Sequence, residues 1–447
     1  MKKLTFTIIL FIIIKVSIGQ SNFECYTLED PYEKSATCNN WNNYSAVDPN
    51  NTPIKTVRIT FHILQKANFT GNFPDNSTSR NWLSVNLMNA INGRMGSRQS
   101  MNLPTSSPAI ADCRIRFTLA NIYFWQNDTD WSFQITDSYG DNLYTKYVTS
   151  QAGVANKTNS IHIFMSENDA IRHGRANNFG SKDWITSSRI YSDYLINDTY
   201  GPASIISHEL GHAMGLHHTW SSFDNDFCND TPTNPNCWNV NEPTGCTPLS
   251  NNIMDYNANQ NALTICQINR MHYFLLGGQG NISDCVISGV SVQNPAIVGP
   301  DLICSTGATY TLSNLQLGVT STWNTSPTNF FQNNTGCSNF ASILPISSSV
   351  GGAGQVSFIF DWQKYGTSST SKNLWVGKVN QLDICTFDRN VYQADNIFSP
   401  GTSCQPMSAI ISNGKSVTMI GGAITLNGGF EVQLGGTFEV KNTGGCQ

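Results

Sequence analysis

The 447-residue sequence has few charged residues, since Asp, Glu, Lys and Arg together make up only 12% of it. So little charge disfavours a helical cytosolic enzyme, whereas abundant Asn, Ser, Thr and Gly are typical of extracellular β-rich proteins with long polar loops. No apolar run is long enough for a transmembrane segment, which excludes a helical membrane protein. The 13 cysteines include no C-x-x-C pair, so we do not expect cysteine thiolates to bind a metal.

The first 19 residues have the pattern of a signal peptide. Lys2 and Lys3 precede an apolar run, Leu4 to Ile14, that is too short to span a bilayer, and small residues suit cleavage before Gln20. This segment holds three Lys and no acidic residue, so its removal changes the net charge from −5 to about −8 (−5 minus 3). Such mild acidity disfavours nucleic acid as a partner. We therefore expect a secreted protein whose cysteines form disulfides.

The most informative stretch is residues 208–218, which read H-E-x-x-H-x-x-G-x-x-H in a chain with only 8 His. His208 and His212 are four residues apart, so a helix places both on one face, where they suit two ligand positions of a zinc site. If the helix continued, His218 would lie about 9 Å beyond His212 along the helix axis, too far to share a metal ion with it. Gly215 can adopt the left-handed conformation that ends a helix and lets the chain return His218 to the metal.

Glu209 follows His208 directly and lies off the ligand face, where it can take a proton from a water that the metal activates. Three His ligands leave a fourth position for that water, as in catalytic rather than structural zinc sites. An ordinary amphipathic helix can carry H-E-x-x-H alone, but Gly215 and His218 favour a zinc site. We interpret His217 as a bystander or a residue of the substrate cleft, and His62 and His162 as strand residues.

With the segment that follows, this motif resembles the metzincin zinc proteases, and among them the pappalysin-type proteases. The resemblance covers the zinc motif, the following Asp-Thr-Pro, a turn of the form N-x-M-D-Y and a helix that opens with Thr. The matching residues are Asp230-Thr231-Pro232, Asn252 to Tyr256, and Leu263-Thr264 with Gln267, Arg270 and Met271. It implies that Met254 forms a hydrophobic base under the zinc. It also implies that Tyr256 lies near the metal as a weak ligand or a hydrogen-bond donor to the transition state.

The expected fold of residues 54–286 is the α+β metzincin catalytic domain, with a twisted mixed sheet, an active-site helix and a Met-turn. Hydrophobic periodicity predicts three strands, an edge strand above the cleft and a helix behind the sheet. The three strands are expected at residues 56–64, 114–125 and 160–165, the edge strand within 175–191 and the helix at 82–95. The zinc helix is expected at 202–214, and a closing helix at 267–276.

The resemblance also implies two disulfides around the loop after the zinc helix. They would join Cys228 to Cys246 and Cys237 to Cys266. Many metzincins are kept latent by a propeptide cysteine, so Cys25 in the segment 20–53 is a candidate for that role. A local Cys25–Cys38 disulfide is the alternative that we favour.

Two β-rich modules are expected after the catalytic domain. Residues 293–380 alternate as sandwich strands do and resemble the polycystic-kidney-disease-like immunoglobulin-type modules, with Cys304–Cys337 as a candidate bridge. Residues 381–447 carry a repeat of period eight and resemble a coathanger-stack module of bacterial exported proteins. Stacking at that period would bury four side chains together. They are Leu426, Phe430, Leu434 and Phe438.

Two functions follow from these patterns. The first is a secreted zinc endopeptidase that hydrolyses extracellular proteins or peptides, with Glu209 as general base. The alternative is a surface adhesin or glycan-binding protein with a relic protease domain, which the intact Glu209 disfavours. The C-terminal modules are candidates for attachment to a cell surface or a glycan.

Two further expectations concern calcium and substrate preference. Calcium is a candidate at Asp224, Asp226 and Asp230, where plain turn chemistry is the alternative. Residues 257–261 contain no acidic residue, so we expect no strong preference for a basic substrate residue after the scissile bond.

Overall fold

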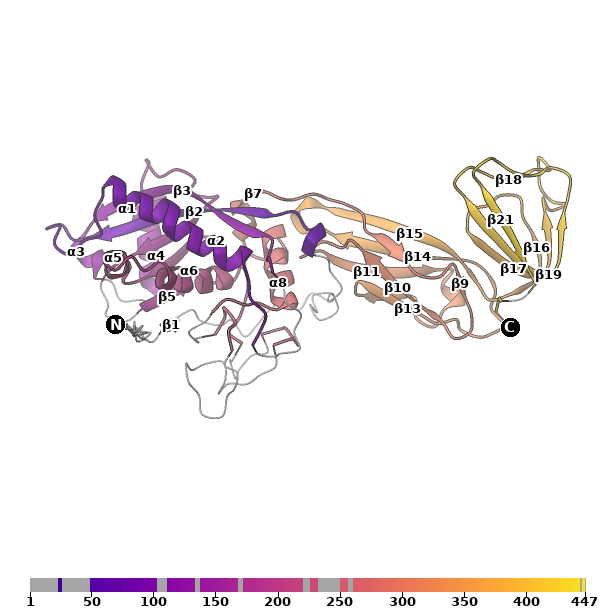
Figure 1. Ribbon diagram of the computed structural model, residues 1–447, viewed down its shortest axis with the longest axis horizontal. Coiled ribbons are helices and arrows are strands. Elements are labelled where there is room, and N and C mark those ends of the chain that lie inside the picture. Colours follow the sequence, from indigo (N-terminus) through magenta and orange to yellow (C-terminus); the bar gives the residue numbers. More distant parts are fainter. Residues whose placement is uncertain are drawn as a thin grey trace, which may run out of the picture.

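The protein is described from a computed structural model. It covers residues 23–25, 49–102, 111–132, 137–167, 172–219, 226–231, 250–255, 260–442 and 444–446. The chain forms a row of three units: an N-terminal unit (residues 49–288 with strand β1), a sandwich (296–376) and a C-terminal module (379–446) (Figure 1). Among these residues, no helix combines the length and the hydropathy of a membrane span. The expected signal peptide lies outside the described residues.

The N-terminal unit is built on one twisted mixed sheet with the strand order β1-β5-β6-β4-β2-β3, to which β7 adds antiparallel beside β2. Its neighbours pair in parallel, except β5 and β6. The strands are β1 (Phe23–Cys25), β2 (Lys55–Gln65), β3 (Ile115–Gln126), β4 (Ile161–Met165), β5 (Arg172–Ala176), β6 (Trp184–Ser187) and β7 (Val286–Ser288). This agrees with the predicted mixed sheet.

The predicted edge strand is only partly right. Two short antiparallel strands, β5 and β6, replace a single strand within residues 175–191, because the chain turns back at Gly180, whose φ is +71°. The outer strand of this pair is β5, which begins at Arg172, ahead of the predicted range. Among the described residues, β1 is the strand that extends the sheet beyond β5 and forms its edge.

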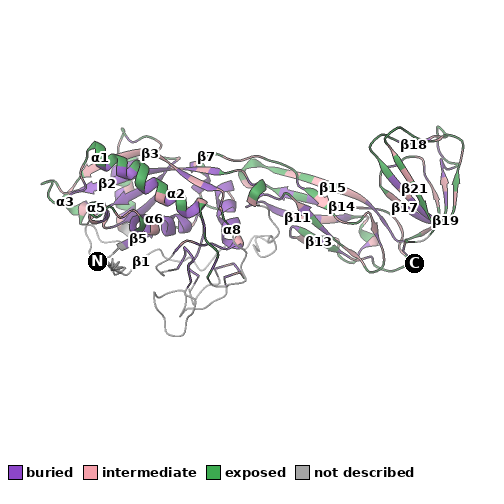
Figure 2. Cartoon of the chain, in the orientation of Figure 1, coloured by how far each residue is buried: buried purple, intermediate pink, exposed green. Residues whose placement is uncertain are grey.

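Helices pack against this sheet and on one another. The predicted helix at 82–95 is part of a longer run that begins with a capping box between Asn76 and Ser79. The helical segments of this unit are η2 (Pro49–Asn51), α1 (Ser77–Asn81), η3 (Trp82–Leu87), α2 (Met88–Gly96), α3 (Asp128–Trp131), α4 (Asp137–Tyr144), η4 (Thr145–Thr149), α5 (Ile190–Leu195), α6 (Tyr200–Ala213), α8 (Ile265–Leu276) and η5 (Ile282–Cys285). Both α6 and α8 are buried along most of their length (Figure 2).

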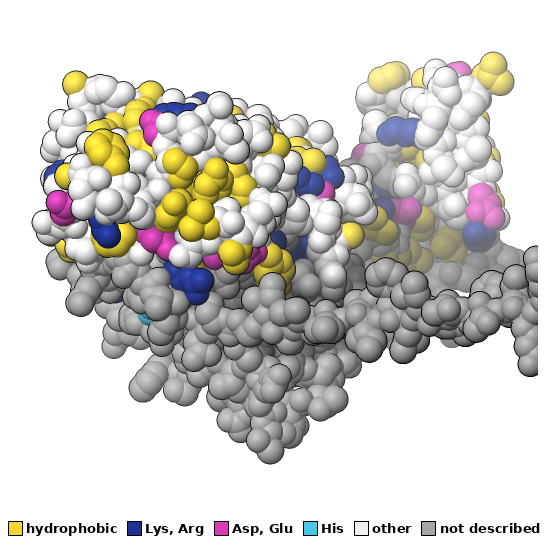
Figure 3. Space-filling view, turned by 60° about the vertical axis from the view of Figure 1, so that its left-hand side comes forward, with side chains coloured by type: hydrophobic (Ala, Val, Ile, Leu, Met, Phe, Trp, Pro, Cys, Tyr) yellow, Lys and Arg dark blue, Asp and Glu magenta, His cyan; other side chains and the backbone are white. Residues whose placement is uncertain are grey.

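One face of the N-terminal unit carries little charge (Figure 3). Figure 3 shows a mostly uncharged face, with hydrophobic side chains in small groups and a few basic and acidic side chains between them. This surface agrees with the 12% of charged residues in the sequence.

The sandwich consists of two packed sheets. One has the order β13-β10-β8 and the other β12-β11-β14-β15-β9. The strands are β8 (Ala296–Val298), β9 (Leu302–Ile303), β10 (Ala308–Ser313), β11 (Thr320–Ser326), β12 (Thr335–Cys337), β13 (Phe340–Ile343), β14 (Gly352–Asp361) and β15 (Thr367–Val376), with short helical turns η6 (Thr328–Phe330) and η7 (Gln363–Tyr365). The candidate bridge Cys304–Cys337 is wrong, because Cys304 is bonded to Cys446. Cys446 lies at the end of the C-terminal module, so this disulfide joins that module to the sandwich.

The sandwich and the N-terminal unit share one continuous hydrophobic core that reaches from Val57 to Val376. Helix α8 lies at their junction. Asn269 Oδ1 accepts a hydrogen bond from the backbone N–H of Gly318 at 2.6 Å, and Lys364 Nζ donates to the carbonyl of Ser283 at 2.7 Å. The sandwich therefore supports the same helix that lies under the candidate site described below.

The C-terminal module is a stack of parallel strands in two sheets, of order β16-β17-β19-β21 and β18-β20. The strands are β16 (Val379–Asp383), β17 (Val391–Ser399), β18 (Ala409–Ile411), β19 (Ser416–Leu426), β20 (Phe430–Val432) and β21 (Thr437–Lys441). Ala409 pairs with Phe430 and Ser416 with Thr437, so the last two coils stack at an offset of 21 residues (430 − 409 and 437 − 416).

The predicted burial at period eight is therefore wrong. Leu434 is 97% exposed and Leu426 is 45% exposed, while Phe430 and Phe438 are only partly buried. A coil of this stack needs two strands and two turns, so its repeat must be longer than the eight residues of one strand and one turn. The sequence similarity at period eight is therefore between successive strands of one coil, and not between strands that stack on one another in neighbouring coils.

His62 of β2 and His162 of β4 are both buried in neighbouring strands, as expected from the sequence. Their Nε2 and Nδ1 atoms are 2.9 Å apart, and Trp125 Nε1 donates to His62 Nδ1 at 2.9 Å. Burial lowers the pKa of His62 well below its usual value and that of His162 to about 4. Both imidazoles are therefore neutral in the folded protein at neutral pH.

We expect the protein to lose stability in mild acid. Below pH 6.5 the unfolded chain binds protons at these histidines while the folded chain does not, until the pH approaches about 4 at His162. The free energy of unfolding should fall by up to about 1.4 kcal/mol per pH unit for each such histidine. Denaturant titrations from pH 8 to 5 measure this, with His162→Gln as the comparison. An unchanged slope in that variant would contradict the assignment to His162.

Candidate metal centre

Helix α6 supplies most of the candidate site. It carries His208, Glu209 and His212, all fully buried. The helix ends at Ala213, and Gly215, two residues later, has a φ of +87°. The N–H of Leu216 donates back to the carbonyl of Gly211 at 2.9 Å. This left-handed turn sends the chain back toward the helix, so that His218 reaches the two helical histidines.

The three histidines converge on one point. Their Nε2 atoms lie 3.1 Å apart for His208 and His212, and 3.2 Å apart for each of the two pairs with His218. Nitrogen ligands about 2.05 Å from a tetrahedral zinc lie about 3.3 Å from one another. The spacing of the three nitrogens therefore fits a zinc ion.

The hydrogen bonds on the far side of the rings agree with this fit. His208 Nδ1 donates to the carbonyl of Ile253 at 2.8 Å, and His212 Nδ1 donates to that of Leu216 at 2.7 Å. A carbonyl only accepts, so Nδ1 carries the proton and Nε2 of each neutral ring directs its lone pair at the common point. Burial and the two neighbouring histidines hold the pKa of His212 well below its usual value. Converging lone pairs of this kind suit a cation.

The carboxyl group of Glu209 faces the edge strand β5. A Cβ atom built on Gly174 of β5 would lie only 2.7 Å from Glu209 Oε1. The backbone of β5 thus lies so close to the carboxyl group that a side chain larger than that of glycine would not fit at position 174. Glu209 therefore lies next to His208 in sequence and against Gly174 of β5 in space.

Met254 lies directly beneath α6. A Cβ atom on Gly211 would overlap Met254 Sδ, so the thioether sits under the turn of helix between His208 and His212. The turn is held by Asn252, whose Oδ1 accepts from Met254 N at 2.8 Å and whose Nδ2 donates to Gln267 Oε1 at 2.7 Å. The role of Met254 as a hydrophobic base under a zinc ion stays a prediction. Tyr256 lies outside the described residues.

Helix α8 fixes the glycine turn from below. Its Arg270 donates from Nε to the carbonyl of Gly215, and its Phe274 packs against the same glycine. The helix begins at a capping box between Thr264 and Gln267, so the Gln267 side chain serves both the helix cap and the Met254 turn. The sequence motif contains these residues, but nothing in it indicates their contacts.

The predicted disulfide pairing around this site is wrong. Cys228 is bonded to Cys266, with Cα atoms 5.6 Å apart, whereas the resemblance implied Cys246 and Cys237 as their partners. Asp230 Oδ2 accepts from the N–H of Cys266 at 3.1 Å and draws residues 226–231 onto the start of α8. That contact brings Cys228 beside Cys266. Cys237 and Cys246 lie outside the described residues.

Two of the candidate calcium ligands, Asp226 and Asp230, accept hydrogen bonds from the loop and from the start of α8. Asp226 accepts from the N–H of Cys228 and from the hydroxyl of Thr231, and Asp230 accepts from Cys266. Burial raises the pKa of Asp226 to about 7, which disfavours its charged form. These bonds are those of a turn and a helix cap, and Asp224 lies outside the described residues.

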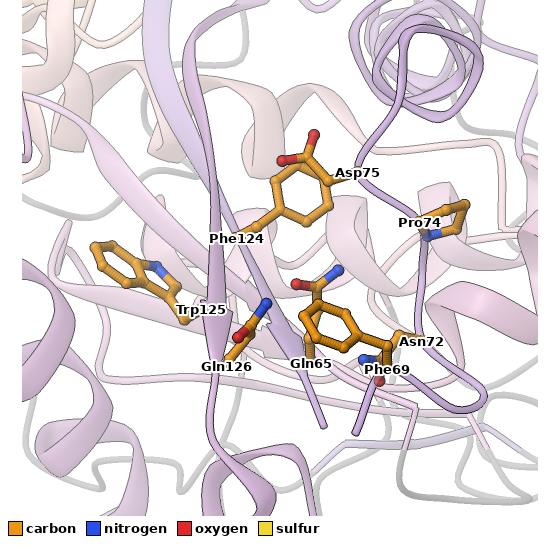
Figure 4. A pocket seen from close by; sticks show the side chains of 8 residues that line it. All are labelled: Gln65, Phe69, Asn72, Pro74, Asp75, Phe124, Trp125 and Gln126. Carbon is orange, nitrogen blue, oxygen red and sulfur yellow. The ribbon is translucent and has the colours of Figure 1, made fainter. Parts of the chain in front are cut away.

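A hollow of about 660 Å³ opens at the opposite edge of the sheet, at the ends of β2 and β3 (Figure 4). It is lined by Gln65, Phe69, Asn72, Pro74, Asp75, Phe124, Trp125 and Gln126. Asp75 is paired with Arg80, and the Asn72 side chain is bonded twice to the backbone of Lys66. None of the three histidines lines this hollow, so it is separate from the metal centre.

Comparison with known families agrees with the geometry. Residues 142–276 match a peptidase family described as pregnancy-associated plasma protein-A. The match begins in α4, includes the three histidines and Met254, and ends with the last residue of α8. No curated protein matches the chain. The match supports a metalloprotease domain of the pappalysin family, whose members use zinc and act on peptides or proteins.

Proposed function

We propose that this protein is a secreted zinc-dependent endopeptidase of the metzincin type. The observation that carries the proposal is the convergence of three histidine Nε2 atoms within 3.2 Å beside the buried carboxyl group of Glu209. His208, His212 and His218 would hold the ion. The Cys228–Cys266, Cys304–Cys446 and Cys385–Cys404 disulfides support secretion, since such bonds persist in oxidising compartments.

When bound, zinc supplies Lewis acidity, which polarises the scissile carbonyl and lowers the pKa of water. The chain supplies the other parts. Strand β5 offers backbone hydrogen bonds that hold the substrate in an extended form across the site. Glu209 takes the proton of the attacking water and passes it to the leaving amine. Tyr256, two residues after Met254, is our candidate donor to the oxyanion.

Strand β1 occupies the same edge. It pairs in parallel with β5, with Cys25 opposite Gly174. A substrate that pairs with β5 must displace β1, so we propose that β1 blocks this edge until the residues ahead of Pro49 are removed. Thr52 and Val57 are the first buried residues of the described core, so a chain that starts at Pro49 retains all of these core residues.

The test combines metal content with cleavage. We expect about one zinc per chain, and hydrolysis of a denatured protein substrate that stops when a chelator removes the zinc and returns when zinc is added. The chain should be assayed both complete and after removal of the residues ahead of Pro49, and the shortened chain should be the faster one. A zinc-loaded, shortened chain that cleaves no denatured protein would refute the proposal.

A further inference from the structure

Three rings form a row beside the metal centre, and we refer to Phe179, His217 and Phe227 as the aromatic row. Phe179 stacks on His217 with ring centroids 4.0 Å apart and an angle of 15° between the planes. Phe227 meets the same imidazole edge-on at 5.2 Å. At the other end, Phe179 meets His212 edge-on at 5.6 Å. The row thus connects a candidate zinc ligand to residues that the zinc motif does not include.

The turn that carries Phe179 is firmly held. Phe179 lies between β5 and β6, directly before Gly180. The carbonyl of Gly180 accepts hydrogen bonds from the N–H groups of Asn281 and Ile282, both at 2.9 Å. The position of Phe179 therefore does not depend on its own ring contacts alone.

The two ends of the stack differ in exposure. His217 is only 3% exposed, whereas Phe179 is only partly buried. One face of the Phe179 ring packs on His217, and part of the remaining ring surface is accessible. Phe179 is thus the member of this stacked pair that a bound peptide can touch.

The position of Phe179 along the cleft follows from β5. Gly174 of β5 lies beside Glu209, and Phe179 comes five residues later, after the strand has ended at Ala176. A substrate that pairs antiparallel with β5 runs in the opposite direction, so its residues before the scissile bond lie toward the end of β5. These substrate residues therefore approach Phe179.

We propose that Phe179 is a specificity-determining residue, whose ring forms an apolar wall of the cleft and selects an aromatic or large aliphatic side chain on the substrate before the scissile bond. This inference rests on the proposed peptidase function. It assigns His217 the role of backing the wall rather than that of a ligand. Aromatic pairs gain from stacking as well as from burial, so aromatic substrate side chains should be preferred over aliphatic ones.

The test compares Phe179→Ala, Phe179→Tyr and the unchanged chain, all shortened to begin at Pro49. Phe330→Ala is the matched control, because Phe330 is also partly buried but lies in the sandwich. Each protein cleaves a peptide library that varies the residues before the scissile bond. We expect Phe179→Ala to reduce the preference for aromatic over alanine substrates, measured as the ratio of kcat/KM values, by about tenfold or more, mainly through KM. Phe179→Tyr should restore it, and Phe330→Ala should leave it unchanged.

A purely structural role gives a different result. If Phe179 only supports His212, its removal lowers zinc content or lowers kcat for all peptides alike, and the substrate preference stays the same. That outcome would overturn the inference.

Binding separates this inference from the peptidase proposal. In a Glu209→Ala background, affinity for the same peptides is measured by fluorescence without cleavage. Weaker binding of aromatic peptides after Phe179→Ala supports the wall even if the unchanged chain cleaves nothing. Equal binding, or none in either protein, overturns it.

Discussion

Replacement of Glu209 by alanine is expected to lower kcat for peptide hydrolysis by about a thousandfold while zinc content stays at that of the unchanged chain. General acid–base catalysis contributes about 10²- to 10⁴-fold, and this buried carboxyl group against Gly174 of β5 is the candidate base. It is not one of the three converging ligands, so the metal should remain. Single-turnover cleavage of a fluorogenic peptide, with metal analysis of the same sample, measures both quantities.

Ser207→Ala is the matched control for this experiment. Ser207 precedes the zinc motif on the same helix and is fully buried, and its hydroxyl oxygen has no hydrogen-bond partner among the described residues. Its removal should leave kcat within about twofold, since it loses no interaction of the site. Equal activity in Glu209→Ala and Ser207→Ala would rule out the general base. Loss of zinc in Glu209→Ala would instead give the carboxyl group a structural part in the metal centre.

Gly215→Ala is expected to lower the free energy of unfolding by about 2–5 kcal/mol and to weaken zinc binding. Two effects add at this position. A residue with a Cβ atom is unfavourable in the left-handed conformation by about 1–2 kcal/mol, and Gly215 has a φ of +87°. The added methyl group would also overlap the ring of Phe274, which is fully buried, and overpacking costs about 1–3 kcal/mol.

The zinc-free and zinc-loaded proteins should respond differently to this change. The turn at Gly215 directs His218 to the other two histidines, so a shift of the turn removes one ligand as well as stability. Denaturant unfolding with and without zinc measures both effects, and Gly153→Ala is the control, because a Cβ atom there meets nothing within 4 Å. Should Gly215→Ala unfold like Gly153→Ala in both states, the glycine turn has no special part in forming the site.

The convergence of the three histidines could be predicted from the sequence because its geometry is local. His208 and His212 are joined by helical spacing, and a single glycine decides where His218 goes. The helix at 82–95 and the strands at 56–64 and 160–165 were predictable for the same reason, since periodicity along a short segment reports which face is buried.

Contacts between distant segments were not predictable in this way. The Cys228–Cys266 bond depends on Asp230 meeting the start of α8, and the Phe179–His217 stack depends on how the β5–β6 turn lies against the zinc motif. Neither leaves a spacing pattern in the sequence. In the C-terminal module, the similarity at period eight was real but joined strands of one coil, and only the strand pairing gives the 21-residue offset between the last two coils.

The Cys304–Cys446 disulfide has a mechanical consequence. It joins the beginning of the sandwich to the end of the C-terminal module, and Gln393 adds two hydrogen bonds to the backbone of Cys446. Tension applied to the chain beyond Cys446 therefore enters the sandwich directly at Cys304, and the parallel coils between the two cysteines carry none of it. If this end of the protein is tethered, the module can be cut or can unfold without releasing the units that precede it.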